Sequence, residues 1–272
     1  MRAGRLNTRR YKTRRRGGWA LVLAALLALA GMGLYRGWIT LQLPAVEWKR
    51  PAATAQPAEP AAARTVTLPG QSWFALQLGA FDQEAAAQAL ADAYRARGAG
   101  GYLLKSDGFR VLAAAYPTRA EAQAVQHQLQ TQHGVDTVIV EISRPEITLR
   151  LTGPIDQLTA LEDAYDAVWK LSAHLSALFQ ALDQGQTDVE NADTALQSEK
   201  TTVAALESRL RSLYDASGAA AVDDLAQLLL DAGQALDGCL SAPGKTRLGA
   251  QVKYCHLLCV CRMAAYAEAL TR

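Results

Sequence analysis

The sequence contains little cysteine and few charged residues. Its 272 residues include four cysteines, all of which lie beyond position 238, and no two of them form a Cys-x-x-Cys pair. This scarcity excludes a small scaffold held together by many disulfides and gives no sign of a zinc knuckle. Charged residues make up 20% of the chain and hydrophobic residues 50%, whereas about 25% of residues are charged in ordinary globular proteins. The chain is therefore too apolar for a disordered tail and long enough for more than one folded unit.

Acidic residues are absent before Gly17, where basic residues are dense. The rest of the chain has 20 basic residues against 26 acidic ones, a net charge of −6. Nucleic-acid binding needs positive charge on the docking surface itself, so we expect no nucleic-acid partner. The eight basic residues that precede Gly17 are Arg2, Arg5, Arg9, Arg10, Lys12, Arg14, Arg15 and Arg16.

Residues 19–35 (WALVLAALLALAGMGLY) are uncharged and mostly apolar. As a helix, this segment would span ~25 Å of a hydrocarbon core that is ~30 Å thick, and Trp19, Tyr35 and Trp38 lie where interfacial aromatics belong. Positive charge concentrates on the preceding side. The positive-inside rule therefore predicts a cytoplasmic arm at residues 1–18, a transmembrane signal anchor at residues 19–35 and an extracytoplasmic remainder.

A cleaved signal peptide is the alternative, because Ala28-Leu29-Ala30 has the small-x-small form of a cleavage site. The basic arm is long for a signal peptide, and cleavage at Ala30 would leave a short apolar region, which favours the anchor. Residues 36–71 follow with five of the nine prolines, many alanines and no apolar period. In either case they predict a semi-rigid, extended linker that spaces an exported body from the membrane.

The hydrophobic period changes repeatedly over residues 72–143. Alternating residues predict strands. A helical stripe that Asp82 caps and a Thr118/Glu121 capping box predict two helices, the second ending at Gly134. The order is βαββαβ, and its two halves resemble each other. Such a repeat predicts an α+β, ferredoxin-like domain: a four-stranded antiparallel sheet with two helices on one face and the other face open. The predicted strands are residues 73–79, 102–105, 109–115 and 137–142.

Two segments of this repeat carry a family resemblance. Residues 77–81 (QLGAF) and 109–112 (FRVL), each followed by a helix that begins near a Glu-Ala pair, resemble the two halves of a SPOR (sporulation-related repeat) domain. The family's usual second Gly and Pro are Ala114 and Ala115 here. The resemblance implies binding to peptidoglycan, in particular to glycan strands that lack stem peptides. It further implies a role in cell division or sporulation and a septal location at the cell membrane.

The expected ligand contacts lie on the open face of this sheet. The resemblance assigns Gln77 and Arg110 to glycan binding. A sugar chain needs amide or guanidinium donors beside flat apolar surface, and Trp73 and Leu112 supply that surface next to these two donors. Two alternatives stay open: Trp73 could cover the junction with the linker, and Arg110 could be a solvated charge that pairs with Glu141.

Residues 154–270 predict an all-α helical bundle. Apolar residues at a 3-4 spacing begin at Pro154 and again after a Thr187/Glu190 capping box, which predicts two long helices in an antiparallel hairpin. Residues 219–237 and 246–270 supply two more helices. A coiled-coil oligomer is the alternative, but the breaks at 184–186, 217–218 and 243–244 favour folding within one chain. No motif in these residues indicates a specific function, and we expect an interaction domain for a protein partner.

We expect no catalytic residue, no cofactor and no metal. Cys255 and Cys259 lie one helical turn apart with His256 between them, and neighbours on a helix do not face each other as a nucleophile and its base must. The cysteines are instead core thiols, or Cys239 forms a disulfide with a cysteine of the last helix, or the cluster holds a metal. Two other functions are alternatives. One is a cell-wall hydrolase or hydrolase regulator that uses the repeat for targeting, and the other is an RNA-binding sheet, which the missing RNP pattern disfavours.

Overall fold

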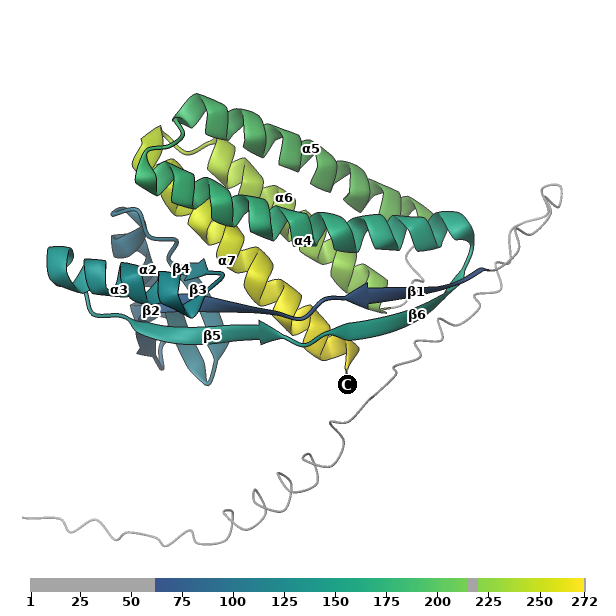
Figure 1. The fold of residues 1–272 in the computed structure, drawn as a ribbon, viewed down its shortest axis with the longest axis horizontal. Coiled ribbons are helices and arrows are strands. Elements are labelled where there is room, and N and C mark those ends of the chain that lie inside the picture. The colour runs from purple at the N-terminus through teal and green to yellow at the C-terminus, as the bar shows by residue number, and fades with distance from the viewer. Residues whose placement is uncertain (1–61, 215–219, 272) are drawn as a thin grey trace, which may run out of the picture. The chain divides into compact units, whose positions relative to one another are not determined.

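The computed structural model describes residues 62–214 and 220–271 (Figure 1). The expected cytoplasmic arm, the expected membrane helix and the first part of the expected linker lie outside the described residues. Among the helices of residues 62–214 and 220–271, none has the length and apolar character needed to cross a membrane.

The repeat forms the four-stranded antiparallel sheet that its hydrophobic pattern predicted. The strands β2 (Gln71–Phe81), β3 (Tyr102–Ser106), β4 (Gly108–Tyr116) and β5 (Val138–Arg144) are ordered β3-β4-β2-β5. Helix α2 (Glu84–Arg95) packs Ala87 and Ala91 against Val111 of β4, and α3 (Arg119–His133) packs on the same face. Together these elements give the βαββαβ order with both helices on one side.

The N-terminal caps of α2 and α3 agree only in part with the expected ones. The Thr118 side chain accepts a hydrogen bond from the Glu121 N–H at 3.2 Å, which confirms the predicted cap of α3. Asp82 was wrongly expected to cap α2. Because β2 stays paired as far as Phe81, the helix starts later, with Gln83 at its N-cap and no side-chain cap.

A second sheet contradicts the predicted extent of the linker. Strand β1 (Ala62–Leu68) pairs antiparallel with β6 (Ile147–Gly153), from Ala62 opposite Gly153 to Leu68 opposite Ile147. The linker prediction was therefore wrong over the residues of β1. The signal that was missed is the alternation of ARTVTL, in which β-branched residues favour an extended chain. Strand β6 buries its alternating apolar residues Ile147, Leu149 and Leu151.

Four helices complete the chain: α4 (Ile155–Gln184), α5 (Val189–Leu213), α6 (Ala220–Leu240) and α7 (Gly244–Leu270). Helices α4 and α5 form the predicted antiparallel hairpin, because Asp163 pairs with Arg209 at 2.8 Å while His174 pairs with Glu199 at 2.6 Å. The turn between them places Gly185 at φ +72°. The α5 cap lies one residue beyond the expected Thr187, since Asp188 accepts from the Asn191 N–H at 2.9 Å.

The sheet and the bundle share one continuous core. Leu76 and Tyr116 of the sheet belong to the same buried cluster as Phe179 and Leu182 of α4 and Cys255 of α7. The rings of Tyr116 and Phe179 meet edge to face, with 5.7 Å between their centroids. Burial of this apolar surface stabilises the two parts together, so each part's stability depends on the other.

We predict that two glycines of similar conformation differ in their tolerance of alanine. Gly101, before β3, has φ +59°, and a Cβ there would lie 2.7 Å from the Ala91 carbonyl oxygen. Gly134, after α3, has φ +62° and no atom within 4 Å of a Cβ. Gly134→Ala should lower the free energy of unfolding by about 1 kcal/mol through backbone strain alone, and Gly101→Ala by roughly 3 kcal/mol through strain plus the clash.

Urea unfolding of residues 39–272 measures both changes in unfolding free energy. Equal losses in the two variants would mean that the close approach at Gly101 is absent in solution.

Candidate functional site

Helix α7 covers the sheet face opposite α2 and α3. Trp73 is 5% exposed and Leu112 is fully buried, and both belong to one cluster with Leu257, Val260 and Cys261 of α7. The expectation that this face is open was therefore wrong over the part that Trp73 and Leu112 occupy. In this structure their side chains face a helix and not solvent.

The composition of residues 255–261 of α7 could have indicated this packing, although the 3-4 spacing of apolar residues did not. Between Cys255 and Cys261, every residue of α7 except Leu258 is buried. A helix that is apolar on all sides must be covered on all sides. One side of α7 meets the bundle, and the remaining apolar side requires the sheet.

One row of side chains crosses all four strands and shows where the cover ends. Val138, Gln77, Leu112 and Tyr102 are successive cross-strand partners, and directly opposed residues share a face. Leu112 is fully buried beneath α7, Gln77 is half-buried, and Val138 is 60% exposed. Accessibility therefore increases along the row toward β5.

Arg110 lies on the same face, two residues along β4 from Leu112. Its cross-strand partners are Ala80 on β2 and Leu104 on β3. The side chain is half-buried. Leu104 packs against the α7 cluster, so we call Gln77, Arg110 and Val138 the open strip of the sheet.

The alternative pairing of Arg110 with Glu141 is not present. Glu141 instead lies 3.5 Å from Arg119 and accepts a hydrogen bond from the Ser72 hydroxyl at 2.8 Å. Glu141 is on the face that α2 and α3 cover, opposite Phe74, and the Phe74 ring also contacts Arg119. Arg110 and Gln77 have no side-chain hydrogen bond or ion pair to the other residues of 62–214 and 220–271. Their donors are free for a ligand, and their assignment to glycan binding stays a prediction.

A cleft of about 850 Å³ lies on the sheet face that α2 and α3 cover. Leu76, Leu78 and Ala113 are among the apolar residues that line it, and Asp183 and Lys253 are among the polar ones. Lys253 already donates to Asp183 at 2.8 Å and to the Gly98 carbonyl at 3.0 Å. Two of its polar groups are thus used within the protein, which makes this cleft a weaker glycan site than the open strip.

The four cysteines are free thiols, and all are buried. Burial raises the pKa of Cys261 to about 12. Hydrogen bonds with Cys239 and Cys259, together with burial, raise the pKa of Cys255 well above its usual value. All four thiols pack as core groups, which agrees with the core alternative and not with a Cys239 disulfide.

His256 is the polar group at the centre of the contact between α7 and the sheet. It is fully buried, and its ring meets Trp73 edge to face at 4.6 Å and Phe179 at 5.5 Å. Neither ring nitrogen has a hydrogen-bond partner among the described residues. Burial lowers the pKa of His256 from 6.5 to about 3, so the ring is neutral at physiological pH.

The comparison with known families bears on this sheet. Residues 61–141 match the family model of the SPOR domain. SPOR domains bind peptidoglycan and are known from cell division. The match runs from β1 into β5 and ends before the helical bundle, so it includes Gln77 and Arg110 but none of α4 to α7. No curated protein and no solved structure matches the chain significantly.

We predict that acid weakens the folded state through His256. Its pKa is lower in the folded protein than in the unfolded chain, so the full contribution to stability is present above pH 6.5 and falls as the pH drops toward 3. Between pH 7 and pH 4.5 the protein should lose about 2–3 kcal/mol of unfolding free energy.

His256→Leu, which cannot gain the proton, is the matched variant, and urea unfolding at pH 7, 5.5 and 4.5 is the measurement. An equal loss in the variant and the parent over this range would assign the acid sensitivity to carboxylates and contradict the role of His256.

Proposed function

We propose that this protein is a membrane-anchored bacterial protein that binds peptidoglycan through its SPOR-like domain. Its ligand would be glycan strands without stem peptides, and its site of action the septum of dividing or sporulating cells. The match of residues 61–141 supports the peptidoglycan ligand. The basic arm and apolar segment of residues 1–35 support a single membrane span with the N-terminus in the cytoplasm.

The observation that carries the proposal is the pair of free donors on the open strip. Gln77 and Arg110 lie on neighbouring strands and the same face, and neither side chain is used within the described structure. Sugars offer hydroxyl and N-acetyl oxygens as acceptors, and the exposed Val138 adds apolar surface for a sugar ring. In this proposal Gln77 and Arg110 contact the glycan directly.

Trp73 and Leu112 have a different role in the proposal from the one their sequence positions predicted. Because α7 covers them, a glycan on the open strip would rest beside α7 rather than on these two side chains. Their packing fixes the strands that present Gln77 and Arg110. The helical bundle is then available for a protein partner on its other faces.

We predict that residues 39–272 co-sediment with purified cell-wall sacculi, and more strongly after an amidase has removed stem peptides. Gln77→Ala and Arg110→Ala should each weaken the binding roughly tenfold, as expected for the loss of a hydrogen bond to a polar ligand. Arg150→Ala is the matched control, because Arg150 is an exposed arginine on β6 that lies outside the SPOR match.

Unfolding midpoints of all variants establish that the fold is kept. Binding by the parent without any loss in the two strip variants would place the glycan elsewhere on the protein. No binding with or without amidase would reject the peptidoglycan ligand itself.

A further inference from the structure

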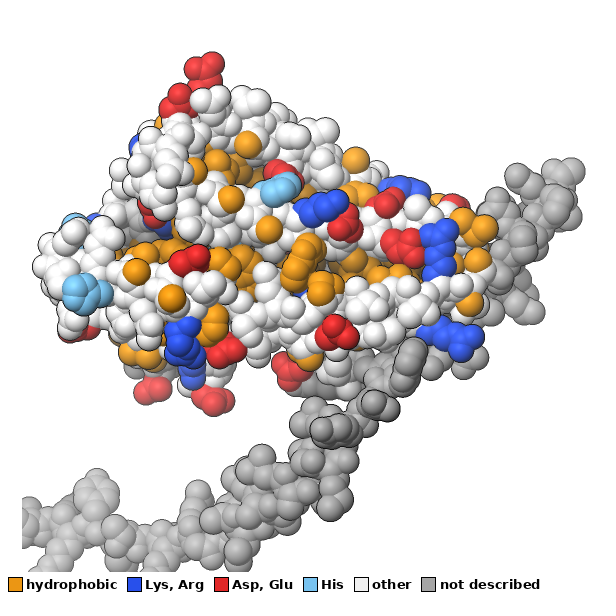
Figure 2. Space-filling model, in the orientation of Figure 1, with side chains coloured by type: hydrophobic (Ala, Val, Ile, Leu, Met, Phe, Trp, Pro, Cys, Tyr) orange, Lys and Arg blue, Asp and Glu red, His pale blue; other side chains and the backbone are white. Residues whose placement is uncertain are grey.

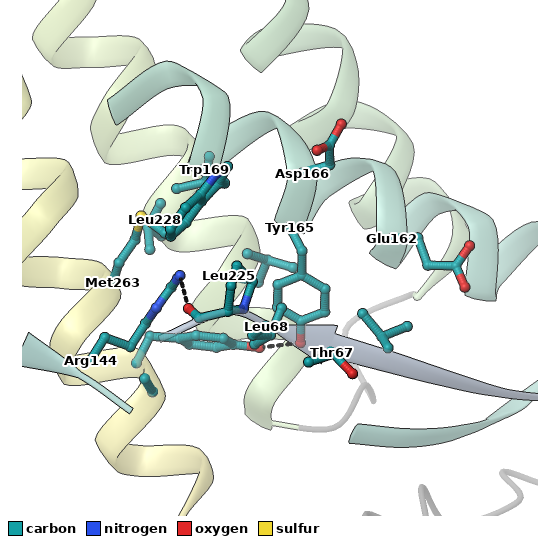
Figure 3. Close-up of a pocket in the computed structure, with 15 residues that line it drawn as sticks. Thr67, Leu68, Arg144, Glu162, Tyr165, Asp166, Trp169, Leu225, Leu228 and Met263 are labelled. Atoms are coloured by element: carbon teal, nitrogen blue, oxygen red, sulfur yellow. Dashed lines mark hydrogen bonds between the residues drawn. The ribbon is translucent and has the colours of Figure 1, made fainter. Parts of the chain in front are cut away.

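A second pocket lies where the strands meet the bundle, outside the open strip. Its volume is about 250 Å³, and it is enclosed by the end of β1, the end of β5 and helices α4, α6 and α7 (Figure 3). Figure 2 shows a band of hydrophobic side chains on this face, between α4 and the ribbon of β1 and β6. Most of the lining is apolar or aromatic: Val66, Leu68, Tyr165, Trp169, Leu228 and Met263.

Arg144 is the basic residue among those that line this pocket, and Glu162 and Asp166 are the acidic ones. It is only 9% exposed, and its side chain donates one hydrogen bond to the Pro69 carbonyl at 2.6 Å. The guanidinium lies over the Trp169 ring, 4.6 Å from the centroid, as Figure 3 shows. Its Nε atom is buried and has no hydrogen-bond partner among the described residues. A buried charge ordinarily has an ionic or hydrogen-bonding partner for each polar atom, and Arg144 lacks one.

The two carboxylates that line the pocket are paired with other residues and do not neutralise Arg144. Glu162 pairs with Arg64 at 2.6 Å, and Asp166 pairs with Lys170 at 2.7 Å. Figure 3 shows both carboxylates on α4 turned away from Arg144. No carboxylate of residues 62–214 and 220–271 lies within ion-pair distance of Arg144. Arg144 is thus a positive charge without a carboxylate partner in a pocket whose lining is mostly apolar or aromatic.

We propose that this pocket binds a small organic anion, a carboxylate on an apolar body, with Arg144 donating hydrogen bonds to the carboxylate. The volume exceeds the roughly 150 Å³ that holds a benzene molecule and lies below the ~300–1,000 Å³ typical of drug-sized ligands. A benzene-sized body with one acidic group fits these limits. Arginine presents its donors in a planar fork that matches a carboxylate, and Tyr165, Trp169 and Tyr266 provide flat surface for the body.

The site is independent of glycan binding. Arg144 lies beyond the residues that match the SPOR domain, and the open strip contributes no residue to this pocket. The binding of a small anion can therefore succeed or fail in experiment whatever the outcome with sacculi.

Calorimetric titration of residues 39–272 with phenylacetate and with phenylacetamide tests the proposal. The two probes have the same ring and differ in charge. Phenylacetate should bind at least tenfold more tightly than phenylacetamide, because only the anion supplies the missing charge beside Arg144. Equal binding of the two probes, or binding of neither, overturns the proposal without any substitution in the protein.

Two variants locate the site. Arg144→Met keeps the length and apolar stem of the side chain and removes the charge, so it should abolish the preference for phenylacetate. Arg150→Met, at an exposed position on β6, should leave the preference unchanged. A preference that survives Arg144→Met in a protein with an unaltered unfolding midpoint would place the anion at another site.

Discussion

The burial of α7 on both of its sides is the constraint on which the rest of the structure depends. Leu257 and Val260 pack on the sheet, while Cys255 and Cys259 join the core of the bundle. Because α7 has apolar surface on both sides, the sheet and the bundle cannot separate without exposing one of those sides to water. His256 lies at this contact as a neutral ring, and neither of its nitrogens has a hydrogen-bond partner among the described residues.

This packing also decides which part of the sheet can meet a large ligand. A four-stranded sheet with two helices on one face ordinarily offers its whole second face, but here α7 occupies the half around Trp73 and Leu112. The proposed glycan contact is thereby narrowed to the open strip. A binding surface of this size presents few contacts, so its recognition depends on the unpaired polar groups of Gln77 and Arg110 rather than on area.

The sequence predicted what local periodicity determines. Alternation and a repeated turn pattern were sufficient for the order of strands and helices along the chain and for the face that carries Gln77 and Arg110. The Thr118 cap followed from its spacing to Glu121. It did not predict the cover by α7, because two elements far apart in sequence pack through shape and burial that no local pattern specifies. Arg144 was missed for a related reason. An arginine at the end of a strand looks solvent-exposed until helices from the other end of the chain enclose it.

The pairing of β1 with β6 has a mechanical consequence. Strand β1 is already extended, and only Pro69 and Gly70 separate it from β2, the strand that carries Gln77. If residues before β1 are held at a membrane while the sheet is held at a wall, tension passes along the backbone of β1 into the central strands. Strand β1 is also hydrogen-bonded to β6 along its length, and Arg64 of β1 pairs with Glu162 of α4. Tension on β1 would therefore be shared between the central strands and the helical bundle, which belong to one continuous core.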